Sequence, residues 1–316
     1  MANREFMTGI THSALARQDT LLPTTLVLLS CFCFGTIPYF ARSLTDAGMA
    51  SHAVAFYRYG ISALLLLPLL LRLPRSKWKT ISWGLASGAF VGLGWVGYVS
   101  GIKTVPVSTI GVLYMTYPVF TILIGALWFH DKPCFKALCG ASIVILAALL
   151  ASSPAAVEPR HLPAMLISLT APISFGVGIN ILVHKLMPIS PLERVASFTV
   201  GASLSLVPLL IATDPQAVLP QTPAGWQLIT GLALGTALIP QLIYTTYAHK
   251  IGAARSSVAG SIELPTMFFI GWFALGENIG PVQWLACLLI TLAILLTPAR
   301  GTRNLTTQLV MPRKPQ

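Results

Sequence analysis

The sequence predicts an all-α polytopic membrane protein with ten transmembrane helices in two inverted five-helix repeats. Hydrophobic residues make up 55% of the 316 residues and charged residues only 9%, whereas a soluble domain has about 25% charged residues. The mean hydropathy is +0.76. Apolar segments recur along the chain, and the two halves of the chain end in similar segments. The composition excludes a soluble cytosolic enzyme and a small disulfide-bonded scaffold.

Ten apolar segments are each long enough, at about 1.5 Å per residue, to cross roughly 30 Å of hydrocarbon. They are 21–41, 50–71, 80–101, 107–129, 135–153, 162–184, 191–212, 226–247, 255–276 and 281–298. Prolines, glycines and charges separate them. The expected organisation is a cytoplasmic tail at 1–20, a first repeat at 21–153, a second repeat at 162–298 and a cytoplasmic tail at 299–316.

The first three spans differ in their unusual residues. The span at 21–41 follows a polar tail and has no small-residue cleavage site after it, so it is expected to be a retained helix and not a signal peptide. Arg58 lies about nine residues into the second span. The third span carries glycines at small-xxx-small spacing, including Gly84, Gly88 and Gly92, which predicts close helix packing.

The later spans carry helix-breaking prolines and buried amides. Pro118 and Pro265 lie within the fourth and ninth spans, and each is expected to bend its helix because proline lacks a backbone N–H. Asn180 and Gln241 lie within the sixth and eighth spans. Buried amides of this kind either link helices by hydrogen bonds or bind substrate.

Positive charge sets the expected orientation. With the N-terminus inside, sixteen of the twenty Lys and Arg residues fall on the cytoplasmic side and three on the other, while Arg58 lies within a span. This bias places both termini in the cytoplasm. The net charge of +11 is scattered between spans and forms no basic stripe with interleaved aromatic residues, so no nucleic-acid function is expected.

The two halves align when the chain is shifted by 146 residues. Tyr98 then falls on Tyr244, and Asp131 falls on Glu277. Each acid ends a similar apolar segment and is followed by one more span. Five spans per repeat is an odd number, so the second repeat must cross the membrane in the opposite sense. Inverted repeats of this kind place a substrate site near the midplane, between the halves.

Several segments resemble the drug/metabolite transporter superfamily, in its ten-span EamA type. The best-matching pieces are FG (34–35), FYRYGISALLLLPLL (56–70), YVSGIKTVPVSTIGVLYMTYPVFTILIGALWFHD (98–131) and SSVAGSIELPTMFFIGWFALGE (256–277). The resemblance implies a two-repeat transporter of small metabolites in the bacterial inner membrane. The sequence departs from the family in three ways: Asp131 replaces the usual Glu, Leu264 separates Glu263 from its proline, and Phe198 aligns with Arg58.

Arg58 and Glu263 are the two ionisable residues placed deepest in predicted spans. An arginine near the bilayer centre costs about 2.5–3.5 kcal/mol on insertion scales, so Arg58 is expected either to contact a substrate or counter-ion or to tie helices together through carbonyl oxygens. Glu263 is expected to share a helix face with Ser256, Gly260 and Met267. It is a candidate proton-coupling acid, and its alternative role is a structural ion pair.

An aromatic set completes the candidate site: Trp95, Tyr98, Tyr114, Tyr117 and Tyr244. Trp95 with Tyr98, and Tyr114 with Tyr117, are three residues apart and can share a helix face. Tyrosine rings with one hydroxyl suit a cavity for amphipathic molecules. Packing or interfacial positions are the alternative, above all for Tyr98 and Tyr244 near span ends.

The predicted function is a secondary transporter that moves an amino acid-like, nucleoside-like or amphipathic compound by alternating access, as an exporter. The alternative is an integral membrane enzyme or flippase acting on a lipid-linked substrate, and a channel or scaffold is a third class. No cofactor, metal site or nucleotide loop is expected. The expected partners are the substrate, the bilayer and protons as coupling ion; a homodimer is left open.

Overall fold

The computed structural model describes residues 21–131 and 159–251, residues 259–296 except 261, and five residues between 139 and 146. Both expected tails and most of the expected span at 135–153 lie outside this part of the chain. Within it every residue is in a helix, turn or loop and none is in a β-strand, which confirms the all-α prediction.

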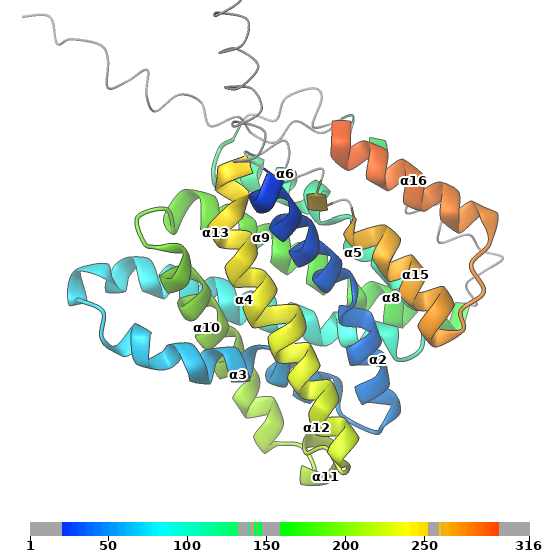
Figure 1. Cartoon of the computed structure of the whole chain (residues 1–316), viewed down its shortest axis with the longest axis horizontal. Helices are drawn as coiled ribbons and strands as arrows, with labels where there is room; N and C mark the ends of the chain where they lie inside the picture. The colour runs from blue at the N-terminus through cyan, green and yellow to red at the C-terminus, as the bar shows by residue number, and fades with distance from the viewer. Residues whose placement is uncertain are drawn as a thin grey trace, which may run out of the picture.

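The helical segments follow one another with short connections (Figure 1). In chain order they are residues 21–35, α2 (Ile37–Asp46), α3 (Ser51–Leu71), η1 (Arg75–Lys77), α4 (Trp78–Ile102), α5 (Val107–Tyr114), α6 (Tyr117–Trp128), η2 (Pro159–His161), α8 (Leu162–Ser168), α9 (Thr170–Lys185), α10 (Pro191–Ile211), α11 (Pro215–Val218), α12 (Pro223–Thr230), the π-helical η3 (Gly231–Leu238), α13 (Ile239–Ile251), α15 (Glu263–Leu275) and α16 (Pro281–Leu296).

Seven helical stretches in the described residues are long and apolar enough to cross a bilayer. They are Leu21–Asp46, Ser51–Leu71, Arg75–Ile102, Val107–Trp128, Pro159–Lys185, Pro191–Ile211 and Pro223–Ala248. They match the predicted spans one to four and six to eight. The shorter apolar helices Glu263–Leu275 and Pro281–Leu292 occupy the predicted ninth and tenth spans. The protein is therefore a multi-pass membrane protein.

Both repeated segments contain a broken helix. The fourth span is interrupted at residues 115–116, and α6 begins at Tyr117, so Pro118 starts a new helix instead of bending a continuous one. In the ninth span Ile262 lies in a turn and α15 begins at Glu263. The prediction that Gly260 and Glu263 share one continuous helix face is therefore wrong; Ser256 lies outside the described residues. The shift of 146 residues maps Tyr117 onto Glu263.

The turns that follow the two broken helices are alike in backbone conformation. His130 has a φ of 56° and Gly276 a φ of 66°, and the shift of 146 residues superposes these positions. The next residue in each turn is the acid that the sequence aligned. Its N–H donates to a glycine carbonyl six residues earlier: Asp131 to Gly125 at 3.0 Å and Glu277 to Gly271 at 2.8 Å.

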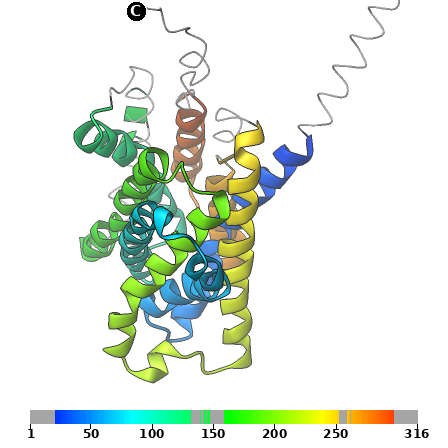
Figure 2. The same ribbon diagram turned by 90° about the vertical axis from the view of Figure 1, so that its left-hand side faces the viewer.

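The packing between helices follows the same repeat. Helix α4 packs on α10, and its counterpart pair, η3 with α3, also packs together. Helix α6 packs on α9 as α15 packs on α2, while α3 with α10 and α5 with α15 join the halves directly. Figure 1 shows α4 and α10 near the centre, with α3 below them and α16 at the right. Figure 2 shows η3 and α13 (yellow) running along one side. This pattern supports an interface between inverted repeats.

Glycines on α4 let two neighbouring helices approach closely, as predicted. A Cβ on Gly92 would lie 2.8 Å from the Ala202 carbonyl oxygen of α10. On the other face, a Cβ on Gly94 would lie 2.7 Å from the Thr170 carbonyl oxygen of α9. Helix α4 therefore packs at short range against α10 on one face and α9 on the other.

A capping box stabilises the start of α10, and its glutamate also contacts the first half of the chain. Ser190 Oγ accepts a hydrogen bond from Glu193 N at 3.3 Å, and Ser190 N donates to Glu193 Oε2 at 2.8 Å. Lys77 Nζ donates to Glu193 Oε1 at 2.6 Å. The connection before α4 is thereby joined to the second repeat.

Candidate functional site

A cavity of about 80 Å³ lies where the two halves meet. This volume has room for a few water molecules. Its walls come from both repeats and from eight of the predicted spans. The lining residues are Phe34, Ile37, Arg58, Tyr59, Val91, Trp95, Tyr114, Phe175, Phe198, Thr199, Ala237, Gln241 and Glu263.

Arg58 enters the cavity from the middle of α3. Its relative exposure is 8%. The guanidinium carbon lies 3.7 Å from the centroid of the Trp95 ring and 5.2 Å from that of Tyr59. These cation–π contacts offset part of the cost of removing the charge from water. Within the described residues, Nε and Nη1 have no hydrogen-bond partner.

Glu263 lines the same cavity from the first residue of α15. Its position suits a carboxylate, because the start of a helix carries partial positive charge. Both Arg58 and Glu263 are described, yet they form no ion pair within 4.0 Å. The cavity therefore holds one basic and one acidic side chain that do not neutralise each other by direct contact.

Four of the five predicted aromatic residues form one cluster. The ring centroids of Trp95 and Tyr98 are 4.6 Å apart, and Tyr114 lies 5.8 Å from Trp95 and 5.6 Å from Tyr98. Tyr117 lies 5.8 Å from Tyr114 and 5.1 Å from Phe175. Trp95 and Tyr114 line the cavity, whereas Tyr98 and Tyr117 pack behind them.

The fifth aromatic residue, Tyr244, lies outside the cavity wall. Its ring makes an edge contact with Phe34 at 6.2 Å, and Phe34 does line the cavity. Gln241, about one turn earlier on α13, also lines it. Tyr244 therefore supports the wall, while Gln241 presents an amide to the interior.

Asn180 occupies a different place from the other candidates. Its Nδ2 donates to the carbonyl oxygens of Thr121 and Gly176, each at 2.9 Å, and it is not a lining residue of the cavity. The bond to Thr121 joins α9 to α6, whereas the bond to Gly176 lies within α9. Of the two roles left open by the sequence, the geometry matches the helix-linking one.

Sequence reasoning did not anticipate several lining residues. Phe34, Phe175 and Thr199 are apolar or small polar residues of ordinary spans, and only the register between helices brings them to the cavity. Phe198 was noted solely as the counterpart of Arg58. Its ring lies 5.8 Å from Tyr59, and the adjacency of Tyr59 to Arg58 was the one local signal that could have indicated it.

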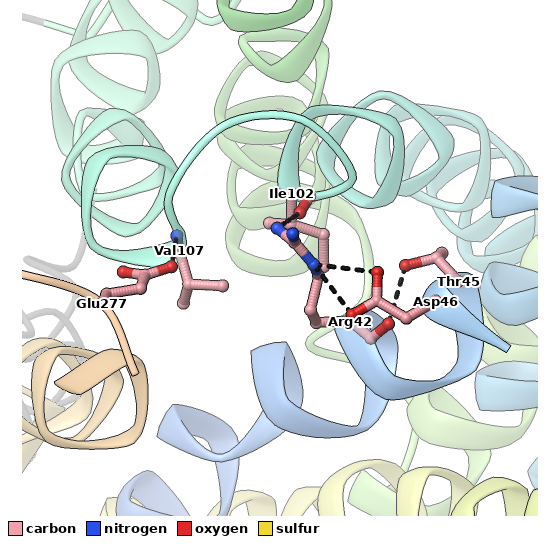
Figure 3. Close-up of polar contacts among 6 residues, drawn as sticks. All are labelled: Arg42, Thr45, Asp46, Ile102, Val107 and Glu277. Atoms are coloured by element: carbon pink, nitrogen blue, oxygen red, sulfur yellow. Dashed lines mark hydrogen bonds and ion pairs between the residues drawn. The ribbon is translucent and has the colours of Figure 1, made fainter. Parts of the chain in front are cut away.

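Glu277 links the end of α15 to the start of α5 in the other half. The backbone N–H of Val107 donates to Oε1 of Glu277 (Figure 3). Ser108 donates to Oε2 through its N–H at 3.1 Å and its hydroxyl at 3.0 Å. The carboxylate thus satisfies N–H groups at the start of a helix that have no partner within that helix.

A second polar contact lies nearby and holds the end of α2. Arg42 Nε pairs with Asp46 Oδ1 at 3.1 Å, while its Nη1 donates to the Ile102 carbonyl oxygen at 2.5 Å (Figure 3). The arginine joins the first and third spans. Together with Glu277 it ties helices at this end of the molecule.

The opposite end of the broken fourth span also pairs the halves. Asp131 Oδ2 lies 3.3 Å from His184 Nε2 of α9, and the Phe129 ring stacks on His184 with centroids 4.3 Å apart. No group of three or more His, Cys, Asp or Glu able to hold a metal ion occurs among the described residues. The polar chemistry of the site comes from Arg58, Glu263 and Gln241 together with hydroxyl groups.

Residues 22–153 and 162–298 each match the EamA-like transporter family. A solved structure described as "Crystal structure of protein" has a TM-score of 0.63 and 16% sequence identity, covering 89% of this chain and 99% of that one. No curated protein matches the chain significantly by sequence. The structural likeness supports the fold, and the two family matches coincide with the two repeats.

Proposed function

Because the chain belongs to the EamA-like transporter family, we propose that it is a secondary transporter that exports a small metabolite across the inner membrane by alternating access. The observation that carries this proposal is the cavity between the repeats, which contains Arg58, Glu263 and Gln241. Ionisable side chains inside membrane bundles mark substrate or ion pathways. Substrate sites of inverted-repeat transporters lie at the repeat interface, next to broken helices.

The proposed cycle rocks one repeat against the other around this cavity. Glu277 at the start of α5 and Asp131 beyond the end of α6 tie the halves at opposite ends of the broken span. Alternate release of these two contacts would expose the cavity first to one side and then to the other. The cavity of about 80 Å³ must widen during the cycle, since binding pockets for drug-sized compounds measure about 300–1,000 Å³.

We assign Glu263 the role of proton-coupling acid. It faces the cavity at the start of a broken helix and has no direct ion pair with Arg58. A carboxylate in this position can exchange its proton with the cavity as the halves rock. Protons are the proposed coupling ion, and the substrate is an amino acid-like, nucleoside-like or amphipathic compound. Both termini are proposed to be cytoplasmic, with sixteen positive charges inside against three outside.

The test uses proteoliposomes and a substrate found by screening amino acids, nucleosides and amphipathic cations. Glu263→Gln should abolish uptake driven by an imposed pH gradient while exchange without a gradient continues. Glu193→Gln is the matched control, because Glu193 is also a buried acid but bonds Lys77 outside the cavity. It should lower stability and leave coupling intact.

The outcomes separate coupling from structure. Full gradient-driven transport by a stable Glu263→Gln protein would remove the coupling role. Loss of both uptake and exchange in a folded Glu263→Gln protein would assign Glu263 to substrate binding instead. Turnover of lipid headgroups without solute flux would replace the transporter by the enzyme alternative.

A further inference from the structure

Three buried polar side chains on α3 and α4 lack hydrogen-bond partners among the described residues. They are Arg58, through Nε and Nη1, Ser62, through Oγ, and Tyr98, through its hydroxyl. Ser62 lies one turn after Arg58 on α3, and Tyr98 lies one turn after Trp95 on α4. Buried donors without a partner are costly. Of these three side chains only Arg58 lines the cavity, so Arg58 is the one that an occupant of the cavity can satisfy.

The other buried or half-buried arginines show what a structural arginine looks like in this protein. Arg194 donates to three backbone carbonyls, those of Leu186, Ile189 and Met187, at 2.9–3.0 Å. Arg42 donates to a carbonyl and a carboxylate. Arg58 makes neither kind of bond. Its only described polar contact is with the faces of aromatic rings.

The stacking of Arg58 on Trp95 leaves a defined edge for a ligand. A guanidinium that lies over an aromatic ring uses its face, while its N–H groups point outward in its own plane. Planar N–H donors match the oxygen atoms of a carboxylate. Arg58 lines the cavity, but Nε and Nη1 are buried in this form, so an anionic group can reach this edge only once the cavity widens.

The rest of the cavity limits what the anion can be. Glu263 lines the same cavity, so a second negative charge on the ligand would be repelled if Glu263 is ionised. Aromatic rings form much of the wall: Phe34, Tyr59, Trp95, Tyr114, Phe175 and Phe198. Such walls favour a flat apolar body with a single charged group.

We propose that Arg58 binds the carboxylate of the transported substrate, a singly charged carboxylate with a flat apolar body. This inference rests on the proposed function, because it assigns the substrate class to the transport cavity. A positive ammonium group elsewhere on the substrate is compatible with Glu263. Arg58 is thus a substrate-binding residue and not a helix tie.

The experiment compares matched acids and amides on the purified full chain in detergent. The probes are 3-phenylpropionate against 3-phenylpropionamide and phenylalanine against phenylalaninamide, with phosphate and chloride as simple anions. The concentration dependence of Tm gives each apparent Kd. In the wild type, at least one acid should bind about 10- to 100-fold more tightly than its amide, as expected for a hydrogen-bonded charged group.

Variants then assign the difference to Arg58. Arg58→Met should abolish the preference for the acid, and Arg58→Lys should retain part of it because the positive charge remains. Arg42→Met is the control: it removes an arginine that does not line the cavity, and it should lower Tm without changing the preference. If Arg58→Met does not fold, the comparison of acids with amides on the wild type and on Arg58→Lys still tests the inference.

The inference is overturned if no acid raises Tm at concentrations up to about 10 mM, or if amides bind as tightly as acids. It is also overturned if phosphate or chloride binds as tightly as the best acid, or if Arg58→Met still prefers the acid. Counterflow in proteoliposomes separates it from the proposed function. Acid binding without any flux would refute the transport function and leave the carboxylate site at Arg58 standing. Flux of amines or neutral compounds alone would leave the transport function standing and refute the carboxylate site at Arg58.

Discussion

Replacing Gly88 by alanine would drive apart the helices that join the two halves. A Cβ at this position would overlap the Phe198 carbonyl oxygen and would lie 2.7 Å from the Phe198 carbonyl carbon and 2.9 Å from the Ala202 nitrogen. All three atoms belong to the α10 backbone, so no side-chain rotation relieves the clash. Helix α10 must move away from α4 as a body.

The expected magnitude follows from two opposing effects. Overpacking of a close contact costs about 1–3 kcal/mol, while alanine favours a helix over glycine by roughly 0.8–1.0 kcal/mol. The net loss in the free energy of unfolding is therefore about 0–2 kcal/mol, and the overlap with backbone atoms places Gly88→Ala at the upper end of this range. Gly235→Ala is the matched control, since a Cβ there meets nothing within 4 Å, and it should be neutral or slightly stabilising.

The assay is thermal melting of the two purified variants and the wild type in the same detergent. Gly88→Ala should lower Tm by several degrees, and Gly235→Ala should leave Tm unchanged or higher. Because the Phe198 side chain lines the cavity, substrate exchange by Gly88→Ala should fall as well. A Gly88→Ala protein that melts with or above Gly235→Ala would refute the close contact between α4 and α10.

Two further predictions concern the ends of the bundle and its orientation. Glu277→Gln weakens three hydrogen bonds at the start of α5. In a cysteine-free background, a cysteine at buried Thr109 should then react several-fold faster with a membrane-impermeant thiol reagent, which corresponds to about 1–2 kcal/mol of lost stabilisation. An unchanged rate would mean that Glu277 does not hold this end closed. Cysteines that replace Asp46 and Asp214 should be labelled from outside intact cells, and one that replaces Ser76 only after permeabilisation, because the positive charges concentrate on the Ser76 side of the membrane. The reverse labelling pattern would invert the proposed topology.

Span positions could be read from the sequence because each span must be a continuous apolar segment. The repeat was equally legible, since Asp131 and Glu277 aligned before the structure placed them after matching left-handed turns. The helix breaks were only half predicted. Pro118 and Pro265 signalled disruption, but proline chemistry alone does not say that a new helix begins at Tyr117 and Glu263.

The cavity wall was harder to predict because it depends on the register between helices. Arg58 and Glu263 were conspicuous as charges in apolar spans, and both line the cavity. Phe175 and Thr199 carry no such mark, because an ordinary apolar or hydroxyl side chain has the same sequence signal on any face. The contact of Arg58 with Trp95 joins residues 37 positions apart on separate helices, so no local pattern encodes it.

The pairing of Tyr117 with Glu263 at the two helix breaks has a consequence for the energy of the cycle. If the two halves were identical and related by a two-fold axis, rotation about that axis would convert the inward-open form into the outward-open form, and the two forms would have equal free energy. Here one equivalent position carries a phenol that packs against Phe175, and the other an acid that faces the cavity. In the proposed cycle the two forms therefore differ in free energy.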